Sequence, residues 1–295
     1  MRIVYIGVVE FSHICLEEII KNKGEVVGVL TKKRSKYNSD FCDLTPISEK
    51  NNIDIKYFDN INDNENIEWI KAKKPDIIFC FGLSQLIKDE ILNIAPMGVI
   101  GCHDTMLPQN RGRHPIIWAL ALGLKETGQT FFVMNKDADT GLILSQRSLK
   151  IEDNDNAKTL YNKINQLACE QIRDFLPKLI NKTYDLIEQD KKLANSWRKR
   201  TRKDGIIDWR MSTEAILNLI KALTKPYPGA EFEYNGQFIT IWEATKYECD
   251  KCYNNIEPGK VVKVIGDCPI VKCYDSLIKL VEYEPRITLK EGEYL

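Results

Sequence analysis

The sequence predicts an α/β fold in which a mostly parallel sheet is covered by helices on both faces, followed by a smaller β-rich domain. Over the first half of the chain, short and nearly continuous apolar runs alternate with amphipathic segments. This alternation is typical of parallel strands buried on both faces. Beyond one helical segment after residue 206, the apolar runs follow one another with only turns between them, which favours a small β-rich domain.

Four expected strands form the parallel sheet, and helical spacing of apolar residues separates them, as at Leu16, Ile19 and Ile20. These strands are RIVYIG (2–7), VVGVLT (26–31), DIIFCFG (76–82) and GVIGCH (98–103). In such Rossmann-like sheets, ligands gather at the carboxyl ends of the strands. Gly7 and His103 each end a strand and are therefore expected at the functional edge.

The rest of the chain gives two strands, a long helix, a linker and the second domain. Two strands joined by a polar turn are expected within 127–151, and a long helix begins near Asp155. A charged, irregular stretch at 184–205 is expected to link a first domain (1–183) to a second (206–295). The second domain is expected to hold a helix at about 212–223 and then the short strands FITIWEA (238–244), KVVKVIG (260–266), PIVKCY (269–274) and SLIKLVEY (276–283).

The composition is that of a two-domain globular protein of 295 residues. Its 42 basic and 42 acidic side chains cancel, which argues against a nucleic acid as the dominant partner. No apolar run approaches the roughly 18 residues of a membrane span, and the first residues favour a strand over a signal peptide. Together with nine scattered cysteines, these features predict a cytoplasmic protein with free thiols and no membrane partner.

His103 is the strongest catalytic candidate. The chain has three histidines, and this one ends a strand and precedes the loop LPQNRGRHP (107–115). Histidine is the side chain best suited to move a proton near neutral pH. The alternative is a turn histidine bonded to a backbone carbonyl. The turn DADTG (137–141) offers Asp137 or Asp139 as a partner for the imidazole. The alternative is that these residues only form a hairpin turn, for which acidic residues followed by Thr-Gly are typical.

These residues resemble the 10-formyltetrahydrofolate-dependent formyltransferases, which include methionyl-tRNA formyltransferase and the nucleotide-sugar N-formyltransferases. The family's pattern is Asn-x-His, then a Leu-Pro and Arg-Gly-Arg-x-Pro loop, and an Asp-x-Gly turn about three dozen residues later. His103, LPQNRGRHP and Asp139 match this pattern. The resemblance continues through FGLSQLIKDEIL (81–92) and DGIIDW (204–209) to KPYPGAEF (225–232), so it covers nearly the whole chain.

The resemblance implies that the second domain is an OB-like barrel, and it implies roles for particular residues. His103 would be the acid–base residue at the attacking amine, and Asp139 would tune it. The acceptor pocket would be bordered by Gly7, Glu10 and Phe11. The folate that donates the formyl group, 10-formyltetrahydrofolate, would contact the residues Leu86, Ile87, Lys88, Arg113, Asn135, Lys136, Asp137 and Ala138. A homodimer is compatible with the resemblance, because members of the family often form dimers.

Gly101 departs from the family pattern. The family's Asn at this position helps to stabilise the oxyanion, and losing one such donor costs roughly 10²–10³ in rate. Three interpretations remain open: another group replaces the donor, the site takes a different acyl donor or a bulkier acceptor, or catalysis is weakened. The first is favoured, because His103, Arg113 and Asp139 are all present.

The expected acceptor follows from the net charge, and the expected metal content from the cysteines. Zero net charge favours a nucleotide-linked aminosugar, with methionyl-tRNA as the alternative. The basic segments TKKRSK (31–36) and WRKRTRK (197–203) are the candidate tRNA contacts. A folate- or nucleotide-binding homologue with weakened catalysis is the alternative from another class. Cys249, Cys252, Cys268 and Cys273 have the residue type of zinc ligands, but free thiols and no metal are expected.

Overall fold

The computed structural model describes residues 1–34, 39–249 and 253–295. Two compact units make up the chain. The first contains residues 1–115, 127–150 and 162–197, and the second contains residues 116–126, 151–161 and 198–295. The segment expected as a linker is therefore divided, because residues up to 197 pack with the first unit and those from 198 pack with the second.

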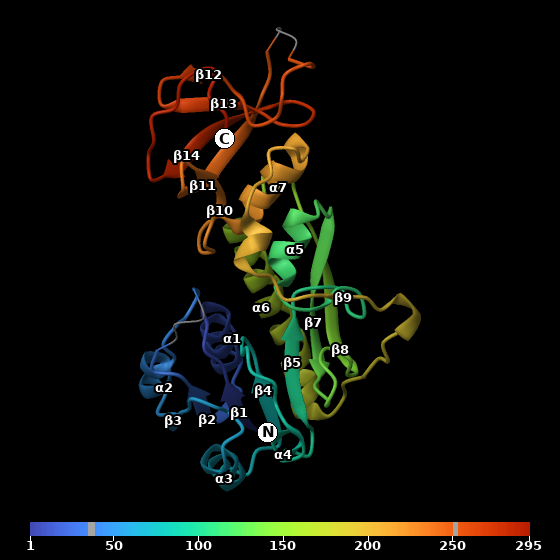
Figure 1. Ribbon diagram of the computed structural model, residues 1–295. Coiled ribbons are helices and arrows are strands. Elements are labelled where there is room, and N and C mark those ends of the chain that lie inside the picture. Colours follow the sequence, from blue (N-terminus) through green and yellow to red (C-terminus); the bar gives the residue numbers. More distant parts are fainter. Residues whose placement is uncertain (35–38, 250–252) are drawn as a thin grey trace. The chain divides into compact units, whose positions relative to one another are not determined.

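A seven-stranded sheet forms the centre of the first unit, with the strand order β3-β2-β1-β4-β5-β7-β8 (Figure 1). The pairs from β3 to β5 are parallel, and β7 runs antiparallel to β5. The fold class that the alternating apolar runs predict is confirmed. The strands are β1 (Arg2–Ile6), β2 (Glu25–Thr31), β3 (Ile55–Tyr57), β4 (Ile77–Cys80), β5 (Val99–His103), β7 (Glu126–Val133) and β8 (Ile143–Lys150).

Helices join the strands of this sheet, and one of them supplies part of an aromatic core. Phe79 and Phe81 stack with ring centroids 5.3 Å apart, and Phe131 and Phe175 meet edge to face at 5.0 Å. Buried aromatic pairs of this geometry add to the stabilisation from burial alone. The helices with residues in this unit are α1 (Glu10–Lys21), α2 (Thr45–Lys50), α3 (Asn64–Ala72), α4 (Asp89–Leu92) and α6 (Ala157–Asn181).

Two short strands outside the main sheet also belong to the first unit. β6 (Arg111–Gly112) pairs in parallel with β9 (Ser196–Trp197). A one-turn 3₁₀ helix, η1 (Lys191–Leu193), precedes β9. This pairing joins the loop after His103 to a part of the chain more than 80 residues later.

The second unit is built on a five-stranded antiparallel sheet with the order β10-β11-β14-β13-β12. Ser212 caps the helix α7 by accepting a hydrogen bond from the Ala215 N–H, as the N-terminal preference for serine predicts. The elements are α5 (Pro115–Ala121), η2 (Arg202–Gly205), α7 (Thr213–Leu223), β10 (Ala230–Tyr234), β11 (Gln237–Tyr247), β12 (Val261–Ile265), β13 (Cys268–Lys272) and β14 (Leu277–Glu284).

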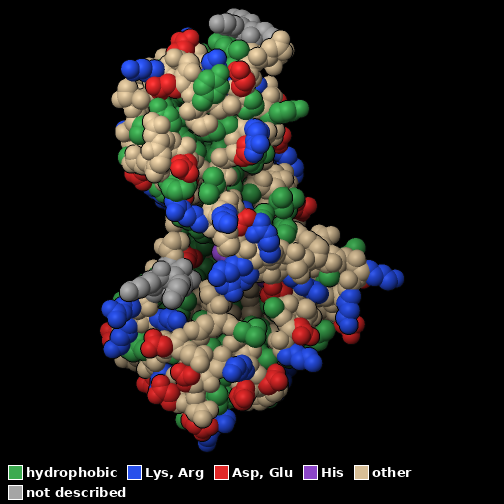
Figure 2. Space-filling view, in the orientation of Figure 1, with side chains coloured by type: hydrophobic (Ala, Val, Ile, Leu, Met, Phe, Trp, Pro, Cys, Tyr) green, Lys and Arg blue, Asp and Glu red, His purple; other side chains and the backbone are tan. Residues whose placement is uncertain are grey.

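Charged side chains of both signs are interspersed over each unit on the face that Figure 2 shows. This distribution agrees with the equal number of basic and acidic residues in the sequence. Within the described residues, no helix is both long enough and apolar enough to span a bilayer.

Candidate active site

His103 is the last residue of β5, at the carboxyl end of the parallel part of the sheet. Its side chain is 7% exposed. The ring atom Nε2 lies 2.8 Å from the carbonyl oxygen of Asn110. Because a carbonyl oxygen can only accept, Nε2 carries a proton, and Nδ1 is the nitrogen that can take up a second one. The bond to a backbone carbonyl, which the sequence offered as the structural alternative, here selects the tautomer that leaves Nδ1 as the base.

Asp139 is a carboxylate that faces that base. Its Oδ2 lies 4.0 Å from Nδ1 of His103 and accepts a hydrogen bond of 2.9 Å from the Gly112 N–H. The backbone of Asp139 is left-handed, with φ of 57°, a conformation that Asp adopts more readily than most residues. The arrangement can therefore hold a proton on Nδ1 and stabilise the imidazolium that results.

Asp104 is a second carboxylate beside the histidine, and the sequence did not single it out. Burial raises the pKa of the Asp104 carboxyl to about 6, although the neighbouring His103 opposes this effect. Asp40 raises the pKa of Asp104 further. A carboxyl with such a pKa exchanges protons close to neutral pH.

Gly101 lies two residues before the histidine on the same face of β5. A Cβ atom added at Gly101 would lie 2.8 Å from Cγ and 2.9 Å from Sδ of Met134, and 3.4 Å from Phe132. The place of a side chain at 101 is therefore filled by Met134, which follows β7 and is half-buried. A thioether sulfur accepts weakly and cannot donate a hydrogen bond, so Met134 does not replace the donor of an Asn.

The loop expected to contact folate after β4 is held in place by Asn62. The Nδ2 of Asn62 donates to the Leu86 carbonyl at 2.9 Å, and its Oδ1 accepts from the Lys88 N–H at 2.9 Å. Ile87 is 2% exposed, whereas the side chain of Leu86 is 60% exposed. An exposed leucine on a fixed loop offers an apolar surface to a planar ligand, while Ile87 anchors the loop in the core.

The other expected folate contacts lie in two loops. Arg113 has an exposed side chain, and its backbone N–H donates to the Trp197 carbonyl at 3.3 Å. Asn135 caps its own turn by accepting from the Asp137 N–H at 3.0 Å and from the Thr140 hydroxyl at 2.8 Å. All four expected turn residues, Asn135, Lys136, Asp137 and Ala138, are exposed.

The expected acceptor residues follow β1. Gly7 is buried, and a Cβ at this position would overlap Ser12, whose hydroxyl accepts from the Val8 N–H at 3.1 Å. Glu10 is exposed, and Phe11 is 6% exposed. Gly7 therefore permits a close turn, and Glu10 is the member of this group with a side chain open to a ligand.

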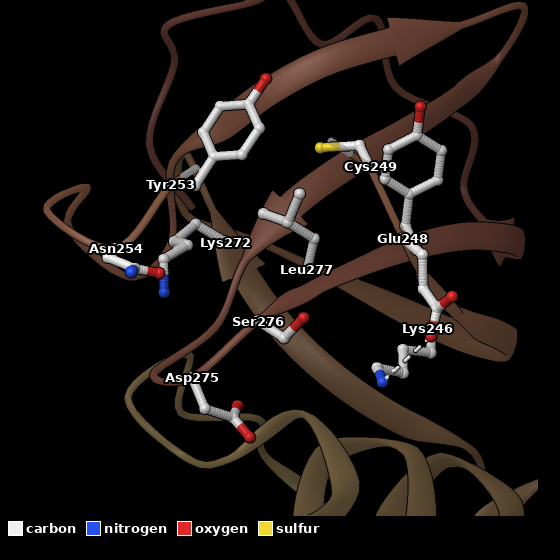
Figure 3. A pocket seen from close by; sticks show the side chains of 10 residues that line it. Lys246, Glu248, Cys249, Tyr253, Asn254, Lys272, Asp275, Ser276 and Leu277 are labelled. Carbon is white, nitrogen blue, oxygen red and sulfur yellow. Dashed lines mark hydrogen bonds and ion pairs between the residues drawn. The ribbon is translucent and has the colours of Figure 1, made fainter. Parts of the chain in front are cut away.

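A cavity of about 310 Å³ in the second unit is lined by charged side chains, and two of these, Lys272 and Asp275, are hydrogen-bonded within the protein (Figure 3). Lys272 is 2% exposed, and its ammonium donates to the Tyr274 carbonyl at 2.9 Å. Asp275 accepts from the Thr213 N–H at 2.7 Å and from the Thr213 hydroxyl at 2.9 Å. These bonds join the turn between β13 and β14 to the start of α7.

The cysteines considered for zinc lie in the same unit. Cys268 and Cys273 are free thiols, Cys249 is exposed, and Cys252 lies outside the described residues. Burial raises the pKa of the Cys273 thiol to about 12. In the part of the chain that the structure describes, no three His, Cys, Asp or Glu side chains are grouped so that they could hold a metal ion.

Family models match both units of the chain. Residues 1–175 match the formyl transferase family, and residues 199–290 match the formyl transferase C-terminal domain. A methionyl-tRNA formyltransferase of Caldanaerobacter subterraneus subsp. tengcongensis is 32% identical over 304 residues, which cover 100% of this chain and 96% of the relative. The bifunctional polymyxin resistance protein ArnA of Wigglesworthia glossinidia brevipalpis is 35% identical over 246 residues, 83% of this chain but only 38% of that protein.

Solved structures share the fold at lower identity. The sugar 3N-formyl transferase WlaRD, solved in the presence of dTDP and 5-N-formyl-THF, superposes with a TM-score of 0.71 at 19% identity, covering 97% of this chain and 99% of that one. An N-formyltransferase from Helicobacter canadensis, in complex with folinic acid and dTDP-3-aminofucose, gives 0.69 at 18% identity, covering 94% and 98%. HypX from Aquifex aeolicus superposes with a TM-score of 0.69 at 17% identity, and the match covers 96% of this chain and 44% of HypX. The resemblance carried by His103, the LPQNRGRHP loop and Asp139 is confirmed by the family matches: this chain belongs to the formyl transferase family.

Proposed function

We propose that this protein transfers the formyl group of 10-formyltetrahydrofolate to the amino group of a nucleotide-linked aminosugar. The observation that carries the proposal is the buried His103, with Nε2 bound to the Asn110 carbonyl and Nδ1 facing Asp139 at 4.0 Å. His103 has a fixed tautomer, and its protonated form would face a carboxylate. These two features suit a base that removes a proton from an attacking amine.

Proton transfer, charge stabilisation and substrate binding are assigned to different residues of the site. The folate supplies an activated formyl group when it is bound. His103 accepts the proton of the attacking amine at Nδ1 as the new carbon–nitrogen bond forms, and it returns this proton to the nitrogen that departs. Asp139 stabilises the imidazolium between these two steps. Asn135 to Ala138, Arg113 and the Leu86–Lys88 loop hold the folate, and the turn at Gly7, Glu10 and Phe11 borders the acceptor.

The charge distribution favours the aminosugar acceptor over tRNA. In the basic run after Trp197, Arg198 is hydrogen-bonded to Asp204 at 2.9 Å, and Arg202 is hydrogen-bonded to Glu231 at 2.8 Å. Arg198 and Arg200 also lie over the Trp118 ring, at 5.3 and 4.6 Å from its centroid. Guanidinium groups that already have carboxylate partners contribute less to phosphate binding.

Formylation of methionyl-tRNA is the second candidate, because the Caldanaerobacter relative matches this chain over its whole length. The other basic segment, 31–36, places Lys32 and Lys33 over the rings of Phe58 and Tyr57, and its last two residues lie outside the described residues. A cytoplasmic location belongs to the same proposal, because the free thiols fit a reducing compartment.

The test is a transfer assay with 10-formyltetrahydrofolate and a panel of nucleotide-linked 3-amino and 4-amino sugars, beside charged initiator tRNA, at physiological salt. We expect formylated sugar from the wild type and a loss of about 10²–10⁴-fold in His103→Gln with unchanged folding. Formylation of tRNA alone would establish the second candidate. If the protein binds folate but transfers the formyl group to no acceptor, it is a folate-binding protein without transferase activity, and the proposal is refuted.

A further inference from the structure

The Asn110 carbonyl at Nε2 of His103 and the Asp139 carboxylate at Nδ1 are both held from one distant segment, residues 187–197, called here the bracing segment. It begins at Ile187, which exchanges two backbone hydrogen bonds with Ile143, of 2.8 and 2.9 Å. It ends at β9, which pairs with β6 beside the Asn110 backbone. The side-chain hydrogen bonds from the bracing segment to the site join residues that are 48 to 85 positions apart in the sequence.

Gln189 holds the Asp139 turn. Its Nε2 donates to the carbonyl oxygens of Asp139 at 3.0 Å and of Gly141 at 2.8 Å. Its Oε1 accepts from Nη2 of Arg111 at 2.6 Å, which fixes the orientation of the amide. Each polar atom of the Gln189 side chain is therefore used, and the donor end is used on the turn that carries Asp139.

Asn195 holds the carbonyl that receives the proton of His103 Nε2. Its Oδ1 accepts from the Asn110 N–H at 2.8 Å, and its Nδ2 donates to Oδ1 of Asn110 at 2.9 Å. The Asn195 carbonyl also accepts from the Arg111 N–H at 3.1 Å. These bonds keep Asn110 in its left-handed conformation, with φ of 60°.

We propose that Gln189 and Asn195 are positioning residues of the formyl-transfer site. Gln189 holds Asp139 at the Nδ1 side of the ring, and Asn195 holds the Asn110 carbonyl at the Nε2 side. Neither side chain bonds His103 itself, so each acts through another residue. This inference rests on the proposed function, because it assigns the bracing a role in proton transfer at His103.

Kinetics of four variants test the proposal: Gln189→Ala, Gln189→Glu, Asn195→Ala and the control Lys192→Ala. Lys192 is an exposed residue of the same segment whose side chain points to solvent. We expect the first three to lower kcat about 10–100-fold with KM nearly unchanged, because small displacements of a catalytic group have effects of this size. Gln189→Glu keeps the acceptor for Arg111 and removes the donor to both carbonyls. Full activity in Gln189→Glu would overturn the proposal.

Nuclear magnetic resonance of the histidine rings gives a readout that does not depend on activity. With three histidines in the chain, a His103→Gln variant assigns the His103 signals. We expect a slowly exchanging Nε2 proton in the wild type and in Lys192→Ala, and faster exchange in Asn195→Ala. An unchanged exchange rate in Asn195→Ala would overturn the proposal even in an active enzyme. A wild type that transfers no formyl group would refute the proposed function instead, while the ring signals would still report on the bracing.

Discussion

The side chain of Met134 fills the space that a side chain at Gly101 would occupy. The backbone of Met134 is held beside β5 by a hydrogen bond of 2.7 Å from its N–H to the Val99 carbonyl. The two residues therefore form one packing unit beside His103. Met134 occupies the volume that an Asn at position 101, as in the family pattern, would need, so the two positions are coupled in space.

The first prediction follows from this coupling. Gly101→Asn alone should force the half-buried Met134 side chain out of its present rotamer, because the new Cβ would lie within 3 Å of two Met134 atoms, and should destabilise the protein by about 1 kcal/mol. Gly101→Asn combined with Met134→Ala should recover most of that loss, and a double-mutant cycle in urea measures the coupling. Additive effects of the two substitutions would contradict the account.

Comparing the double variant with Met134→Ala tests whether a carboxamide at position 101 contributes to catalysis. If the carboxamide acts on the oxyanion, the double variant should transfer formyl groups faster than Met134→Ala, by as much as about 10²-fold. Equal rates would indicate that another group already supplies this stabilisation. The comparison uses Met134→Ala as its reference, so both variants lack the Met134 side chain and differ only at position 101.

The sequence predicted the fold and the pair His103 and Asp139 because each has a local signal. Continuous apolar runs identify the strands, and a histidine at a strand end with a specific loop predicts the candidate site, where the structure brings His103 and Asp139 to within 4.0 Å of each other. Gln189, Asn195 and Met134 have no such signal. Gln189 and Asn195 lie in a charged, irregular stretch that resembles a linker, and Met134 resembles any apolar residue at a strand end. Their importance depends on which backbone atoms the fold brings beside them, and one sequence does not contain that information.

Gly112 is the subject of the second prediction. Its φ is 107°, its N–H binds Asp139, and a Cβ there would overlap the carbonyl oxygen of Trp197. Gly112→Ala should therefore separate β6 from β9, lower the melting temperature by several degrees and lower kcat by at least 10-fold. Gly236→Ala is a matched control, because its φ is 78° but nothing lies within 4 Å of the added Cβ. It should cost only the conformational strain of about 1–2 kcal/mol. Equal melting temperatures of the two variants would contradict the overlap.

Asp139→Asn is the third prediction. The Oδ1 of the asparagine can still accept from the Gly112 N–H, so we expect little change in the melting temperature. The negative charge opposite Nδ1 is lost, and the imidazolium that forms during transfer is no longer stabilised. We expect kcat to fall about 10²–10⁴-fold with a small change in KM. A variant within a factor of three of the wild type would show that Asp139 only shapes the loop.

Asp104 gives the fourth prediction, which concerns stability and pH. Burial raises the pKa of this carboxyl to about 6 in the folded protein, from 3.8 for the unperturbed group. Between about pH 4 and pH 6 the unfolded chain releases a proton that the folded protein keeps. The free energy of unfolding therefore falls as the pH rises through this window and stays lowered above it, by up to about 3 kcal/mol.

Asp104→Asn removes the ionisation while keeping the shape of the side chain. It should stabilise the protein at pH 8, and the difference from the wild type should shrink as the pH falls to 4. Urea unfolding at these two pH values is the measurement, and a variant that is less stable than the wild type at pH 8 would show that the ionised Asp104 has partners that compensate its burial.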